Sequence, residues 1–201
     1  MKTTILFTAA LITAALVEPA MAQTPAAAQP PLGGPLVPGV CLLSREAVFA
    51  NAKVGLAATA RLRELTQAAE TELAAERGPI QADIKTLQAE RANLKPADFA
   101  QRQQAIGQRQ QVLAQKAEQR SQELELTRQK ALTQIADQAQ PAIAAAYKAR
   151  GCGLLVNRDA VFGGNLTNDL TAEVVKGLDA RVTTITFERA SLPAHTASAA
   201  R

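Results

Sequence analysis

One proline-containing break divides a long run of regularly spaced apolar residues, and this pattern constrains the fold of the 201-residue chain most strongly. Before the break, an apolar residue recurs at every seventh position, at Leu73, Ile80, Leu87 and Leu94. After it, the same interval continues at Phe99, Ile106 and Leu113. Seven-residue spacing is typical of helices that pack along a narrow apolar seam. Residues 53–150 are therefore predicted to be almost entirely helical.

The break is the segment Asn-Leu-Lys-Pro-Ala-Asp at residues 93–98. Pro96 disfavours helical geometry at the residue before it but suits the first position of a new helix. Two helices joined by so short a turn must run antiparallel, and a fold-back centred near residue 96 places Leu87 opposite the region of Ile106. An arm of about 40 residues is roughly 60 Å long. We expect an antiparallel helical hairpin that projects, with its tip near residues 93–98; the alternative is a compact bundle that folds back again.

The predicted arms are mildly basic. Residues 53–150 contain 15 Lys or Arg and 11 Asp or Glu, an excess of four that equals the net charge of the whole chain. A mixed-charge helix surface is usually just a solvated face, but a basic excess also attracts anionic partners. No aromatic residues are interleaved with these charges for stacking on bases, so no nucleic-acid partner is expected.

The segments that flank the arms, residues 39–52 and 151–190, predict a small β-rich body. Val40 to Leu43 and Leu154 to Val156 are short apolar runs typical of strands. After a turn of Asn, Arg and Asp, the run from Ala160 to Phe162 predicts another strand. The fold class is therefore α+β, a long coiled-coil hairpin attached to a small β-rich body.

Two further elements complete this body. Thr171 is predicted to cap a short helix, and residues 183–190 alternate in polarity, which is typical of an extended edge. Two or three strands and a short helix cannot stabilise themselves alone, so the body is predicted to oligomerise. The residues expected to form this oligomeric body are Leu42, Leu43, Val48, Phe49, Leu154, Leu155, Val156, Val161 and Phe162.

The two ends of the chain are predicted to lie outside the folded part. Residues 1–22 have one Lys, an apolar run and a small-residue cleavage pattern, which predicts a secretory signal peptide cut before Gln23. The Pro- and Gly-rich residues 23–38 predict a disordered leader, and residues 191–201 a disordered tail. The single histidine, His195, lies in that tail without metal-binding partners.

Three stretches together resemble the Skp/OmpH family of periplasmic chaperones. They are GVCLLSREAVFANAKVGLAA at residues 39–58, the Gln-, Glu-, Arg- and Ala-rich hairpin, and ARGCGLLVNRDAVFGGNLTNDLTAEVVKGLD at residues 149–179. The resemblance covers about residues 39–180. It implies a periplasmic homotrimer in which three hairpins project from a shared body and hold unfolded outer-membrane proteins in a cavity without ATP. The two cysteines and the leader are additions to the family pattern, and the tail beyond Arg181 is longer than in compact members.

In this interpretation the client-binding surface lies on the arms. Apolar side chains would supply weak contacts that allow release, and basic side chains would attract acidic outer-membrane proteins. An anionic membrane surface or lipopolysaccharide is a further partner that a basic surface would accept. The residues proposed for client binding are Ile84, Leu87, Leu94, Phe99, Arg102, Ile106, Arg109, Leu113, Lys116 and Arg120.

No motif for catalysis is recognisable. The chain has no phosphate-binding loop, no paired CxxC and no His cluster. We therefore do not expect an enzyme. We also expect no catalytic residue, no metal-binding residue and no cofactor. The alternative role is a structural coiled-coil spacer or adaptor of the cell envelope.

The two cysteines, Cys41 and Cys152, bracket the hairpin from the same end. An exported chain meets an oxidising compartment, where a disulfide between them would close a loop of about 110 residues. The alternative is two free thiols buried in a small core. A Cα separation above about 7 Å would exclude the bond.

Overall fold

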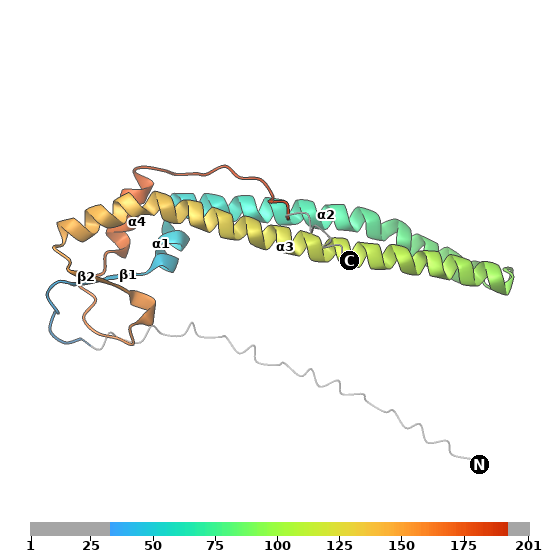
Figure 1. The fold of residues 1–201 in the computed structure, drawn as a ribbon, viewed down its shortest axis with the longest axis horizontal. Coiled ribbons are helices and arrows are strands. Elements are labelled where there is room, and N and C mark those ends of the chain that lie inside the picture. Colours follow the sequence, from blue (N-terminus) through green and yellow to red (C-terminus); the bar gives the residue numbers. More distant parts are fainter. Residues whose placement is uncertain (1–32, 193–201) are drawn as a thin grey trace, which may run out of the picture. The chain divides into compact units, whose positions relative to one another are not determined.

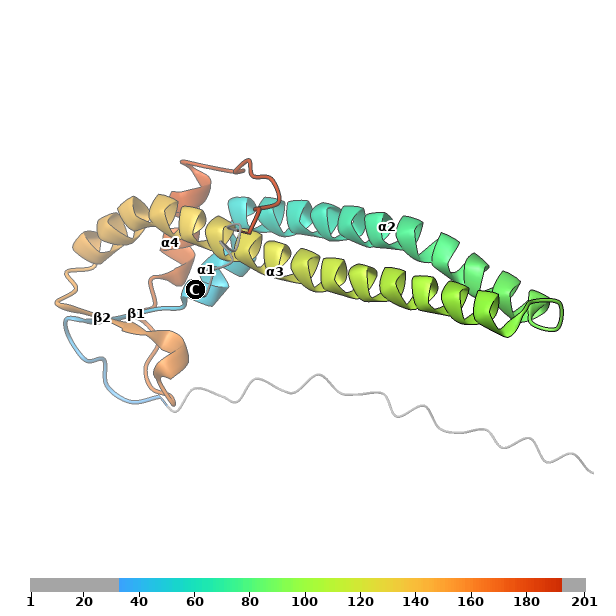
Figure 2. The same cartoon turned by 45° about the vertical axis from the view of Figure 1, so that its right-hand side comes forward.

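Two long antiparallel helices form most of the structure (Figure 1). The structure is a computed structural model that describes residues 33–192. Helix α2 comprises Lys53–Glu90 and helix α3 comprises Pro96–Ala149, and the two lie side by side in both views (Figures 1 and 2). The predicted signal peptide, all but the last residues of the leader, and His195 lie outside the described residues.

The turn between the long helices is short because Pro96 begins α3 directly. Lys95 has extended backbone angles, as expected for a residue that precedes proline, and Asp98 places a carboxylate in the first turn of α3. Both helices continue through an internal proline, Pro79 in α2 and Pro141 in α3. None of the helices in the described part of the chain is long and apolar enough to cross a membrane.

A short helix precedes the hairpin and packs closely on its base. Helix α1, Arg45–Asn51, begins at Ser44, whose hydroxyl accepts a hydrogen bond from the Ala47 amide at 3.1 Å. Gly55 permits the sharp junction between α1 and α2, because a Cβ atom there would lie 1.8 Å from the Phe49 carbonyl oxygen. The junction therefore requires glycine at this position.

The body contains little β-structure, contrary to the prediction of a β-rich body. Strands β1, Val40–Leu43, and β2, Leu154–Asn157, pair in parallel with Val40 opposite Leu154. One isolated bridge between Leu42 and Asp169 extends the pair within the described chain. Parallel pairing of two strands needs a crossover connection, and here the whole hairpin supplies it.

The strand predicted for Ala160 to Phe162 is wrong. The Asn157 side chain accepts a hydrogen bond from the Asp159 amide, and this local turn leads into a 3-10 helix, Arg158–Ala160, instead of a strand. The extended edge predicted for residues 183–190 is also not a strand. That segment has no sheet to pair with and lies along the hairpin instead (Figure 1).

Helix α4, Thr171–Asp179, belongs to the segment of the body that follows the hairpin. Thr171 does not cap it as predicted: the N-cap position is Leu170, and the Asp169 carboxylate accepts a hydrogen bond from the Thr171 amide at 2.8 Å. At the other end of α4, Asp179 accepts the Lys53 amide at 2.8 Å and so caps the start of α2 from a distant part of the sequence. Helix α4 thus fixes the base of the hairpin.

The hydrophobic core lies where the hairpin base meets α1, α4 and β1. Its largest fully buried side chains include Val48 of α1, Val54 of α2, Ile135 of α3, and Val174 and Leu178 of α4. On α3, buried residues follow one face at Ala131, Ile135, Ala139, Ala142 and Ala146. The last turns of α3 are therefore part of the body as well as part of the arm.

Candidate functional site

A ladder of ion pairs joins α2 and α3 along the hairpin. Its members are Glu72 with Arg120, Glu76 with Lys116, Asp83 with Arg109 and Glu90 with Arg102. In each pair the two residues are equally distant in sequence from Pro96. Three of the acids, Glu76, Asp83 and Glu90, are seven residues apart and so lie on one face of α2. These pairs match the fold-back that the proline break predicts.

An apolar seam accompanies the ladder toward the tip. Ile80 and Leu87 of α2 are buried, whereas Ile106 and Leu113 of α3 are only half-buried. Leu87 and Ile106 line a shared surface groove of about 200 Å³, together with the charged residues of the ladder. The distal hairpin therefore combines a thin apolar seam with apolar side chains that remain accessible.

The four cations that were predicted to attract clients are thus engaged within the hairpin. Arg102, Arg109, Lys116 and Arg120 each pair with a carboxylate of α2. The apolar residues predicted for client binding differ in solvent exposure. Leu87 is buried, while the others are half-buried: Ile84, Leu94, Phe99, Ile106 and Leu113. Among the described residues, Arg77 and Lys85 are exposed cations of α2 without a carboxylate within 4 Å.

A charge swap tests whether the ladder sets the register of the hairpin. Arg109→Glu places two carboxylates opposite each other, and we expect the hairpin to lose about 0.5–1 kcal/mol, the usual value of an exposed pair. The double variant D83R/R109E has the net charge of the wild type and should recover that loss in thermal unfolding. A double variant that stays as unstable as R109E would show that the pair does not set the register.

Closer to the base, the ladder ends in a polar cluster that is buried between the helices. Glu123 of α3 is only 4% exposed, and Thr127 is 2% exposed. Arg120 donates to Glu123 at 2.8 Å and to Glu72 at 3.0 Å, and Arg189 lies 3.3 Å from Glu123. The hydrogen bonds from Arg120 and then Arg189 lower the pKa of Glu72 below its ordinary value of 4.5. The cluster therefore favours the charged form of the Glu72 carboxylate.

This cluster is polar where an apolar seam would continue toward the base. Leu124 is half-buried, and its neighbours Glu123 and Thr127 occupy the buried positions instead. An acid and a threonine on an otherwise apolar face give no sequence signal of burial. The partner that satisfies Glu123, Arg189, lies 66 positions later in the chain and could not be identified from helix spacing.

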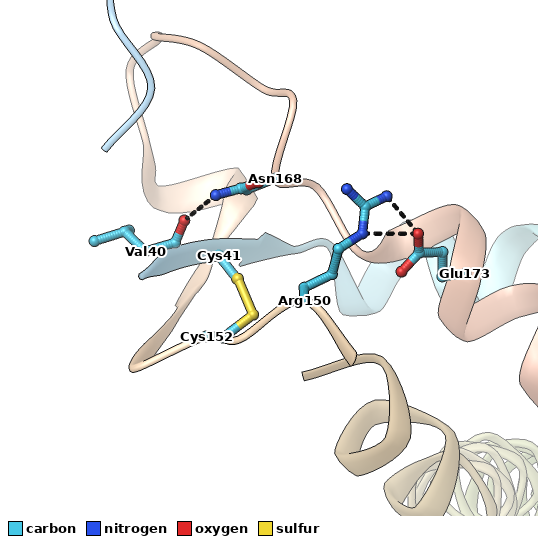
Figure 3. The surroundings of a disulfide bond; sticks show 6 residues. All are labelled: Val40, Cys41, Arg150, Cys152, Asn168 and Glu173. Atoms are coloured by element: carbon cyan, nitrogen blue, oxygen red, sulfur yellow. Dashed lines mark hydrogen bonds and ion pairs between the residues drawn. A yellow bond between two sulfur atoms is a disulfide. The ribbon is translucent and has the colours of Figure 1, made fainter. Parts of the chain in front are cut away.

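The base of the hairpin is closed by a disulfide bond between Cys41 and Cys152 (Figure 3). Their Cα atoms are 5.8 Å apart, within the range that a disulfide requires. Cys41 lies on β1, and Cys152 follows the end of α3, where Gly151 adopts the left-handed conformation with φ of 62°. The bond therefore joins the segments that enter and leave the hairpin.

Polar contacts surround this disulfide. Arg150, at the end of α3, donates to the Glu173 carboxylate of α4 at 2.9 Å, and this hydrogen bond lowers the pKa of Glu173. The Asn168 side chain donates to the Val40 carbonyl at 3.2 Å (Figure 3). Both contacts hold α4 and its preceding loop against the base of the hairpin.

The residues predicted for the oligomeric body separate into two groups. Leu42, Leu43 and Val48 are buried within the single chain, and Phe49 and Leu155 pack against the same core. By contrast, Leu154 is 56% exposed and Phe162 is fully exposed, while Val156 and Val161 are half-buried.

Other exposed apolar residues gather near this second group. Leu36, Val37 and Leu166 are exposed and help to line a groove of about 180 Å³ that also includes Val156 and Val161. We call the five exposed apolar residues of the body, Leu36, Val37, Leu154, Phe162 and Leu166, the apolar body patch; Leu36, Val37 and Leu166 line the groove. Large apolar side chains that cluster on a surface usually mark an interaction site.

The arrangement defines a helical-hairpin protein whose small body is closed by a disulfide. Within residues 33–192, no group of His, Cys, Asp or Glu is arranged to hold a metal ion. The family of OmpH-like outer membrane proteins matches residues 39–178, and the chain belongs to this family.

A solved structure supports the same relation. The crystal structure of a protein from Caulobacter crescentus CB15, described as an OmpH-like outer membrane chaperone, is 33% identical in sequence and has a TM-score of 0.71. The match covers 79% of this chain and 94% of the other. No curated protein matches the chain.

Proposed function

We propose that this protein is an ATP-independent periplasmic holdase chaperone, which binds unfolded outer-membrane proteins between the helical arms of a homotrimer. The observation that carries the proposal is the close structural match to a protein described as an OmpH-like outer membrane chaperone. The membership of the chain in the OmpH-like family supports the same role. Binding without catalysis agrees with a site made of long surfaces instead of a cleft.

The distal hairpin offers the kind of surface that a holdase needs. Ile84, Leu94, Phe99, Ile106 and Leu113 are half-buried, so each presents part of an apolar side chain without forming a deep pocket. Contacts of this kind are weak individually and adapt to many sequences. Long-range attraction of acidic clients is assigned to Arg77 and Lys85 in place of the cations of the ladder.

The apolar body patch supports the homotrimer. The exposed Leu154 of the two-stranded sheet and the fully exposed Phe162, which follows the 3-10 helix, leave apolar area that a neighbouring subunit would cover. Three bodies joined in this way would place three arms around a common space. The patch is therefore the surface that we assign to subunit contact.

Replacing Phe162 with Asp is expected to break this contact. A charge in an apolar interface costs several kcal/mol when it is buried without a partner, so the mass in sedimentation equilibrium should fall from a trimer toward a monomer. Val112→Asp is the matched control, because Val112 is 60% exposed on α3, far from the patch in sequence. A trimer that persists in the Phe162 variant would remove the patch from the interface.

An aggregation assay tests the chaperone function directly. A denatured outer-membrane β-barrel is diluted out of urea with and without the protein, in the absence of nucleotide, and light scattering is followed. We expect suppression of scattering near one trimer per client. Unchanged scattering would reject the holdase and favour the alternative role, a coiled-coil spacer or adaptor of the envelope.

A further inference from the structure

The chain after α4 forms an extended segment that lies along the base of the hairpin (Figures 1 and 2). We call residues 183–192 the C-terminal strap. It begins beyond residue 178, where the match to the OmpH-like family ends. The family relation therefore does not explain what the strap does.

The strap contacts the hairpin through alternate side chains. Ile185 and Phe187 pack against the hydrophobic core, and Arg189 reaches the buried cluster; these three are partly buried. Thr184, Thr186 and Glu188, between them, are exposed. A two-residue alternation is what an extended chain shows when one of its sides lies on a surface.

Side-chain groups, not a backbone ladder, hold the strap in place. Arg61 of α2 pairs with Glu188 at 2.8 Å, and the Ala190 amide donates to the Thr127 hydroxyl at 2.8 Å. Within the described residues, the strap makes no hydrogen bond between two backbone groups. Its displacement would therefore leave both long helices intact.

The surface beneath the strap carries carboxylates that bind a cation. Glu123 is 4% exposed, and a carboxylate buried to that degree is costly unless a positive charge and hydrogen bonds satisfy it. Arg120 supplies one cation from α3, and Arg189 of the strap supplies a second, at 3.3 Å from Glu123 and 3.2 Å from Glu72. The two carboxylates that bind the Arg189 guanidinium group thus follow the contacts of Ile185 and Phe187 with the core.

We propose that this surface is a docking groove for extended client segments in which apolar and polar residues alternate and an Arg or Lys follows, and that the strap is its resident occupant. The proposal rests on the proposed function, because strands of outer-membrane barrels alternate in the same way. A client segment with this pattern displaces the strap, whereas an unpatterned segment does not. By competing for the groove, the strap lowers the apparent affinity of the base of the arm for other segments.

Substitutions in the full-length protein can release the strap without altering the groove. Arg189→Glu places a third carboxylate beside Glu72 and Glu123 and should expel the strap, while Arg120 still pairs with Glu123. Arg181→Glu is the matched control, since Arg181 is exposed and lies before the strap. Arg189→Lys retains the cation and should behave as the wild type does.

The probe is a fluorescein-labelled peptide with the sequence of residues 182–192, VTTITFERASL. By fluorescence anisotropy, we expect R189E to bind it at least ten times more tightly than the wild type, R181E or R189K. A peptide in which Glu replaces its Arg should not bind to R189E, and E123Q/R189E should lose the gain. Equal binding of the peptide to R189E and R181E would overturn the proposal.

A second measurement uses the unaltered protein and the real class of client. Hydrogen exchange of the strap is followed by mass spectrometry before and after addition of the denatured barrel at saturation. We expect the Ala190 amide, which donates to the Thr127 hydroxyl, to exchange faster in the complex, and protection of this amide that is unchanged or higher would overturn the proposal. If the barrel still aggregates in the presence of the wild type and of R189E while the peptide results hold, the holdase function fails but the docking groove stands.

Discussion

Removing the disulfide should cost more stability than any other change considered for this protein. Cys41 and Cys152 are 111 residues apart in sequence, so their bond closes a loop that contains the whole hairpin. In the loop-entropy treatment, a loop of this size contributes about 4–5 kcal/mol by restricting the unfolded chain. We expect C41A/C152A to lose this amount in guanidinium denaturation at a fixed protein concentration.

Reduction provides the control for the cysteine variant. Dithiothreitol should destabilise the wild type by a similar amount and leave C41A/C152A unchanged, because the variant has no bond to reduce. Because the bond acts on the unfolded chain, its removal should change the free energy of unfolding and leave the folded structure in place. The hairpin should keep its helical circular dichroism in water, since the bond does not contact the ladder or the distal seam. A loss below about 1 kcal/mol would contradict the role of the bond as the closure of the base.

Truncation of Ile135 is the second large effect that we expect. Its side chain is 1% exposed and lies where α3 meets the body core. Replacing a buried Ile with Ala usually costs about 2–5 kcal/mol, through lost apolar contact and the cavity that remains. Ile135→Ala should therefore lower the midpoint of thermal unfolding by several degrees.

Val112→Ala is the comparison on the same helix. Val112 is 60% exposed, so its truncation should change the free energy of unfolding by no more than about 0.5 kcal/mol. If Ile135→Ala were as mild as Val112→Ala, the last turns of α3 would not belong to the body core. This result would separate a core that includes the arm from one formed by the flanking segments alone.

The long helices and their register were accessible from the sequence because they depend on local signals. A proline break and seven-residue spacing need no distant partner, and the ion pairs follow once the fold-back is placed at Pro96. The pairing of the cations follows from the same register, because a fold-back at Pro96 places Arg102 opposite Glu90. A helix face taken by itself gives no sign of this pairing.

The structure of the body and of the strap depends on contacts between segments that are distant in the sequence. Residues 160–162 have the composition of a strand, but the hydrogen bond of Asn157 redirects the chain into a 3-10 turn. The alternation of residues 183–190 was recognised, although an alternating chain can lie on a helix pair as well as at a sheet edge. Likewise, Asp179 caps α2 from the opposite end of the sequence, and helix propensities do not reveal such a partner.

The mass of the assembled protein, measured by native mass spectrometry with and without a denatured outer-membrane barrel, tests the central claim most directly. We expect three copies of the mature chain in the free protein and three copies with one client in the complex. ATP should change neither mass. A monomer that stays a monomer when the barrel is added, or a trimer that binds no barrel, would contradict the proposed holdase.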